Sequence, residues 1–203
     1  MAKKDPQVLR LKITLEHVEP APCWEIEMRS HKTLLHFYVA IQAAFLWYDM
    51  HLWDFGIGDR KYQMKSEDFW VEPMWGPPVM EVTTKKVDFF LKTKVPPVIY
   101  TYDFGDDWMH RVELISKRRV VPNEPLPRFV GGQWATPPED IGGPPMYEAF
   151  KEAREDASHP EHDWAKEAGY VDWAHDEIHA DVVRERFTKL QTQKRRERNF
   201  WME

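Results

Sequence analysis

Alternating apolar and polar residues mark the first part of the chain. Residues 8–15 read Val-Leu-Arg-Leu-Lys-Ile-Thr-Leu, and the alternation returns at residues 24–28, after Pro20 and Pro22. A period of two is typical of half-buried strands, so the pattern predicts two strands that pair across the prolines. Residues 51–56, His-Leu-Trp-Asp-Phe-Gly, are expected to form a third strand.

A helix is expected between the second and third of these strands. Thr33 is a suitable N-cap, and the apolar residues that follow it continue as far as Phe45 or Trp47. The order β-β-α-β predicts an α+β fold, with a β-grasp-like sheet and a covering helix.

The rest of the chain alternates between irregular and helical composition. Residues 58–82 are polar and rich in Trp and Pro, which indicates a long excursion, and residues 122–145 are too dense in Pro and Gly for extended regular structure. Helical composition at 146–157 and 172–193 predicts a C-terminal helical extension. We expect a single domain over residues 8–190, made of a β-rich core at about 8–118, a loop at 119–145 and a helical part at 146–193, with a tail at 194–203.

Residues 99–115 are expected to form a β-hairpin, because aromatic and branched residues flank a turn that contains glycine and aspartates. If residues 105–106 form a two-residue turn, Thr101 lies opposite His110. Asp103 then shares a face with His110, and the hairpin carries a carboxylate–imidazole cluster.

A three-residue loop at 105–107 gives a different register. Tyr102 then lies opposite His110, and Asp103 faces Arg111 in an ordinary cross-strand ion pair. In either register, aspartates in a turn can instead accept hydrogen bonds from their own backbone amides. The pattern leaves all three arrangements open.

Composition and charge limit the function classes. The chain has 203 residues, of which 42% are hydrophobic, so it is long and apolar enough for a packed core. A net charge of −6 argues against a dedicated nucleic-acid binder, and Cys23, the only cysteine, excludes an intramolecular disulfide or a zinc site with several thiolates. With no membrane-length apolar run and no signal-peptide core at the start, we expect a cytoplasmic protein that does not bind membranes.

Two motifs connect this sequence with a known family. Residues 102–110, Tyr-Asp-Phe-Gly-Asp-Asp-Trp-Met-His, are followed by residues 137–143, Pro-Pro-Glu-Asp-Ile-Gly-Gly, and by Tyr147. Together with His51-Leu52 in the N-terminal region, they resemble the plasmid pRiA Orf-three-like family, which includes the passenger protein of an insertion sequence labelled resolvase-like. The resemblance implies an α+β fold with a β-grasp-like core, association with mobile elements, and no established activity.

One departure from the family concerns cysteines. Members commonly carry them around the Pro-Pro-Glu-Asp motif, where this chain has Phe129, Thr136 and Ile141. None of these side chains replaces a thiolate, so a thiolate metal site in relatives would be lost here. We expect packing of Phe129 and Ile141 to hold the loop, with Asp140 accepting backbone amides.

A pair of histidines near the C-terminal end has the spacing of zinc ligands. His175 and His179 are at i and i+4, which places both imidazoles on one face of a helix. Asp176 stands where the metalloprotease pattern requires glutamate. The alternative is a solvated helix rich in His, Asp and Glu.

The function best supported by these patterns is a non-enzymatic binding or regulatory module of the mobile-element type. It would bind protein or nucleic acid through the hairpin face, with Tyr102, Trp108 and Asp140, or through the basic and aromatic tail, with Arg195 and Arg196. No cofactor is expected. Basic residues at the end of a helix also simply complement its dipole, so the tail has a structural explanation as well.

The alternative is a metal-assisted hydrolase or nuclease-like enzyme. Asp103, Asp106 and His110 are the candidate catalytic residues, with Asp140 as a further carboxylate, because carboxylate and imidazole ligands suit a divalent ion that activates water. The sequence contains no complete metal signature and no nucleophile–base pair, so we assign no metal and favour the non-enzymatic function.

Overall fold

The computed structural model of the protein describes residues 7–64, 79–88, 98–168 and 173–192. The strands in these residues are β1 (Gln7–Leu15), β2 (Cys23–Arg29), β3 (Trp53–Ile57), β4 (Arg60–Gln63), β5 (Val79–Glu81), β6 (Val98–Tyr102), β7 (Trp108–Arg119) and β8 (Arg128–Gln133). The helices are α1 (Leu34–Phe45), α2 (Gly143–Glu155), α3 (His162–Glu167) and α4 (Ala180–Thr192).

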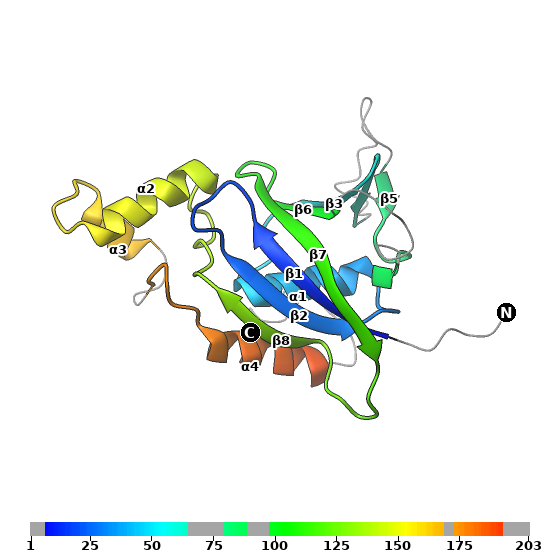
Figure 1. The fold of residues 1–203 in the computed structure, drawn as a ribbon. Helices are drawn as coiled ribbons and strands as arrows, with labels where there is room; N and C mark the ends of the chain where they lie inside the picture. The colour runs from blue at the N-terminus through cyan, green and yellow to red at the C-terminus, as the bar shows by residue number, and fades with distance from the viewer. Residues whose placement is uncertain (1–6, 65–78, 89–97, 169–172, 193–203) are drawn as a thin grey trace.

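The described strands form one mixed sheet in the order β5-β4-β3-β6-β7-β1-β2-β8. Only β4 and β5 pair in parallel, and every other pair is antiparallel. Helix α1 covers one face, and α4 lies beside α1 and β8, whereas α2 and α3 pair with each other away from the centre of the sheet (Figure 1). The α+β class predicted from the sequence is therefore confirmed.

The two faces of the sheet differ as the alternating pattern requires. In β1, Leu11 and Ile13 are buried toward α1, whereas Arg10 and Lys12 point to the opposite face. That opposite face is polar, and Arg10 forms an ion pair there with Glu25 of β2 at 2.5 Å. One solvated face is common in antiparallel sheets.

The predicted strands at 8–15, 24–28 and 51–56 are present as β1, β2 and β3, and α1 begins after Thr33 as expected. The sheet is nevertheless larger than the small one expected, since β4 and β5 form within the predicted excursion and β8 within the predicted loop.

Strand β8 escaped prediction because glycine and proline are poor strand formers in general. As an edge strand, β8 tolerates such residues better than a central strand does. Gly132 is required there, because a Cβ at this position would lie 2.7 Å from the Trp24 ring.

No helix among the described residues is both long enough and apolar enough to span a bilayer.

Candidate functional site

Three segments that are distant in sequence meet at one end of the sheet, where the β6–β7 turn approaches the start of α2 (Figure 1). We call this region, made of residues 49–52, 103–107 and 139–142, the acidic tip. The first two segments are joined by the Asp103 amide, which donates to the Leu52 carbonyl at 2.9 Å.

The turn between β6 and β7 is five residues long, from Asp103 to Asp107. The Asp107 amide donates to the Asp103 carbonyl at 2.6 Å, and these two aspartates have φ angles of 55° and 54°. Aspartate adopts this left-handed conformation more readily than most residues. Asp103 Oδ1 also accepts the Gly105 amide at 2.9 Å, so the expected hydrogen bond between a turn aspartate and its own backbone is confirmed here.

The long turn changes the register of the hairpin. Tyr100, and neither Thr101 nor Tyr102, lies opposite His110. Both registers expected from the sequence are therefore wrong. Asp103 belongs to the turn and shares no strand face with His110.

His110 is completely buried on the core face of β7, where its ring packs edge-on against Phe45 with a centroid separation of 4.6 Å. Burial lowers the pKa of His110 to about 3, so the ring is neutral, and Nδ1 lies 3.2 Å from the Tyr100 carbonyl. The structure therefore does not bring together Asp103, Asp106 and His110, the three candidate catalytic residues.

A different histidine, His51, lies between two carboxylates of the acidic tip. Its Nδ1 is 3.3 Å from Asp103 Oδ2, and its Nε2 is 2.6 Å from Asp140 Oδ1. The Asp103 side chain is 15% exposed and that of Asp140 is 68% exposed. Nothing in the local sequence signals this partnership, because Asp140 follows His51 by 89 residues.

Partly buried hydrogen bonds fix the backbone beneath this cluster. The Tyr102 hydroxyl donates to Glu139, and Glu139 also accepts the Tyr48 amide at 2.7 Å. The Met50 amide donates to the Tyr102 hydroxyl oxygen at 3.0 Å, and the His51 ring stands edge-on to the Tyr102 ring. Tyr102, one of the expected binding residues, therefore supports the tip from the inside.

A second set of contacts joins the turn to the segment before α2. Asp106 Oδ2 accepts the Gly142 amide at 3.0 Å, and a Cβ at Gly143 would lie 2.6 Å from the Asp106 carbonyl oxygen. Asp140 was expected to organise this loop, but its carboxylate faces His51 instead. Asp106 accepts the Gly142 amide, and the partly buried Glu139 accepts the Tyr48 amide.

Exposed apolar side chains flank the cluster. Met50 is 59% exposed, Leu52 48% and Phe104 45%, and we call these three residues the apolar rim. Trp108, the other aromatic residue expected to bind, is buried instead. Its side chain is part of the core beneath the tip.

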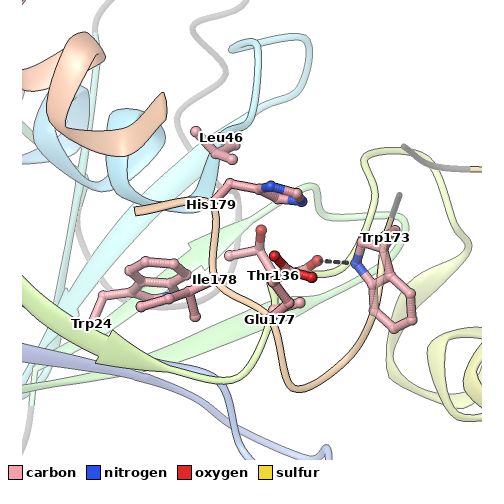
Figure 2. Close-up of a pocket in the computed structure, with 8 residues that line it drawn as sticks. Trp24, Leu46, Thr136, Trp173, Glu177, Ile178 and His179 are labelled. Carbon is pink, nitrogen blue, oxygen red and sulfur yellow. Dashed lines mark hydrogen bonds between the residues drawn. The ribbon is translucent and has the colours of Figure 1, made fainter. Parts of the chain in front are cut away.

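The expected zinc pair near the C-terminal end does not lie on a helix, because α4 begins only after His179. His175 pairs with Glu155 at 2.6 Å. His179 lines a pocket little larger than a water molecule, beside Trp173, whose indole donates to the Thr136 carbonyl (Figure 2). The prediction that both imidazoles share a helical face is therefore wrong.

Two groups of residues from the sequence predictions remain: those at the positions of the family's cysteines and those of the basic tail. Phe129, Thr136 and Ile141, at the positions of the family's cysteines, are buried, which confirms that Phe129 and Ile141 pack against the core. Arg195 and Arg196, with the rest of the tail, lie outside the described residues.

Comparisons with known proteins agree with the motifs. The family described as plasmid pRiA4b ORF-3-like protein matches residues 7–184. An uncharacterized protein, y4hQ, from Sinorhizobium fredii (strain NBRC 101917 / NGR234) is 30% identical over 168 residues, which cover 80% of this chain and 83% of the relative. The crystal structure of a protein of unknown function, MM3350 from Methanosarcina mazei Go1, matches with a TM-score of 0.76 and 26% identity, covering 88% of this chain and 98% of the other. The chain therefore belongs to the plasmid pRiA4b ORF-3-like protein family.

Proposed function

We propose that this protein is a non-enzymatic binding module that holds a cationic protein segment at the acidic tip. The observation that carries the proposal is the apolar rim. Met50, Leu52 and Phe104 are each about half exposed and come from two separate segments that the fold brings together. Exposed apolar groups with polar neighbours are typical of protein interaction sites.

The charge of the tip favours protein over nucleic acid as the partner. Asp103, Asp106, Asp107 and Asp140 all lie in or beside the turn, within a chain of net charge −6. Phosphate backbones are held by lysine and arginine, so this surface repels them. Lysine or arginine residues on a partner are attracted to it, and the attraction also speeds encounter.

The fixed backbone of the tip supports the same function. The hydrogen bonds of Tyr102 and Glu139 hold the segments that carry Met50 and Asp140. A surface that is ordered before binding loses less conformational entropy when the partner arrives. The tip is therefore suited to a partner that adapts its own shape to a rigid surface.

A direct test measures fluorescence anisotropy of a labelled short peptide of alternating Lys and Leu. We expect saturable binding that Phe104→Ser and Leu52→Ser each weaken by about tenfold, which corresponds to about 1.4 kcal/mol. Ile115→Ser is the matched control, because Ile115 is 49% exposed on β7 away from the tip. Equal weakening by Ile115→Ser, or equally strong binding of an alternating Glu and Leu peptide, would contradict the proposal.

A metal-assisted hydrolase is the second candidate, and the position of His51 between Asp103 and Asp140 favours it. In a hydrolase built on this cluster, His51 replaces His110 as the imidazole that binds the metal ion. The test is hydrolysis of bis(p-nitrophenyl) phosphate with added Mn²⁺ or Zn²⁺. Turnover that His51→Asn abolishes would support an enzyme, and turnover that survives this substitution would count against it.

The biological setting is also a proposal. A plasmid-associated protein of the mobile-element type is supported by the family's description, which refers to a plasmid, and we propose that it acts in the cytoplasm. A relationship to β-grasp folds is supported by the order β1-β2-α1-β3 and by the packing of α1 on the sheet.

A further inference from the structure

We propose that His51, Asp103 and Asp140 form a binding site for a divalent first-row metal ion of the Zn²⁺ type. This inference goes beyond the proposed function, because it concerns the polar centre of the tip and makes no use of the apolar rim. Each residue offers one ligand atom, and these three atoms all lie within 4.8 Å of one another.

The spacing is close to what a metal ion requires. Zn²⁺ binds imidazole nitrogen and carboxylate oxygen at about 2.0–2.2 Å, so ligand atoms around a tetrahedral ion are about 3.3 Å apart. Closing the cluster therefore takes a shift of at most about 1.5 Å in its longest separation. Asp140 can supply that shift, because its side chain is 68% exposed.

Hydrogen bonds from outside the cluster orient the other two ligands, Asp103 and His51, as is usual for metal ligands. Asp103 Oδ1 accepts the Gly105 amide at 2.9 Å, which leaves Oδ2 directed at His51. The Met50 amide that precedes His51 donates to the Tyr102 hydroxyl. The imidazole and the first carboxylate are therefore oriented before any ion arrives.

The choice of metal follows from the ligand types. Imidazole suits zinc and other late first-row ions, whereas magnesium and calcium favour sites made only of oxygen. Two carboxylates and one imidazole supply three protein ligands, so at least one coordination position remains for water or for a donor atom of a bound partner. A hydrolase would use that position for water, whereas a binding module would use it for the partner.

A proton is the natural competitor of the ion at this site. Both nitrogens of His51 face a carboxylate oxygen. Because a metal binds only a deprotonated nitrogen, zinc affinity is expected to fall as the pH is lowered.

The experiment is isothermal titration calorimetry of the full chain with ZnCl₂, at pH 7.5 and again at pH 5.5. We expect one saturable site at pH 7.5 that is weaker at pH 5.5 and that His51→Asn or Asp140→Asn weakens at least about tenfold. His175→Asn and Glu155→Gln are the matched controls, because His175 and Glu155 form another histidine–carboxylate pair, also at 2.6 Å.

Circular dichroism shows whether each variant is folded, and Asp140→Asn is the safer of the two site variants because the side chain is exposed. Phe104→Ser should bind zinc as the wild type does, which separates this result from the peptide test. No saturable binding, or binding that the site variants and the control variants affect equally, would overturn the metal site.

Discussion

Tyr102 donates its hydroxyl proton to Glu139, and this partly buried hydrogen bond joins the end of β6 to the loop before α2. Tyr102 is buried and Glu139 is partly buried, and burial raises the pKa of Tyr102 and that of Glu139. The same hydroxyl oxygen accepts the Met50 amide, so one side chain holds all three segments of the acidic tip together.

Tyr102→Phe should destabilise the protein by about 1–3 kcal/mol, because the Met50 amide and Glu139 lose a buried partner. Urea denaturation measures the change. The control is a double-mutant cycle with Glu139→Ala, in which we expect a coupling free energy of about 0.5–3 kcal/mol. Additive effects of the two substitutions would show that the hydroxyl does not join these segments.

Gly143→Ala should disturb the tip more than a glycine-to-alanine substitution at a position with open space and an unstrained backbone. Gly143 has φ of 79°, and a Cβ there would lie 2.6 Å from the Asp106 carbonyl oxygen, so the turn and the loop must separate. We expect a loss of more than about 1 kcal/mol in stability and weaker peptide binding.

Gly131→Ala is the matched control for that substitution, because no atom lies within 4 Å of a Cβ built at Gly131. It should leave thermal unfolding and peptide binding nearly unchanged. If both alanine variants behave alike, close approach of Gly143 to the turn is not what holds the tip.

Stability should depend on pH through His110. Its pKa is about 3 in the folded protein because it is buried, and about 6.5 in an unfolded chain. Between pH 3 and pH 6.5 the unfolded state therefore binds more protons than the folded state. The contribution of neutral His110 to the free energy of unfolding is fully present above pH 6.5 and is lost as the pH falls toward 3. His110 alone changes the free energy of unfolding by up to about 1.4 kcal/mol per pH unit in this range.

His110→Asn isolates the contribution of this group, since other titrating residues are common to both proteins. The free energy of unfolding of the wild type should fall more steeply than that of the variant between pH 6.5 and pH 4.5. Parallel curves over that range would mean that His110 is protonated in the folded state.

Much of the sheet could be predicted from local patterns. The alternation in β1 and β2 sets which side chains face α1, and Thr33 marks the start of that helix. Strand β8 lacks such a pattern, because Gly131 and Gly132 carry no side chain to alternate. Its place at the edge depends on pairing with β2, which no short window of sequence contains.

The site was harder to predict than the fold. Asp103 and Asp140 were recognised as candidates, but the histidine that meets them is His51 and not His110. The hairpin register decides which histidine lies near Asp103. The register depends on left-handed backbone at Asp103 and Asp107, whereas Gly105 led us to expect the turn within residues 105–107. Long-range contacts of this kind leave no periodic signal.

Hydrogen–deuterium exchange with and without the Lys–Leu peptide tests most directly whether the acidic tip is the functional surface. We predict added protection in residues 49–52, 103–107 and 139–142, and none along the solvated face of β1 and β2. Protection confined to other segments, with the tip unchanged, would contradict it.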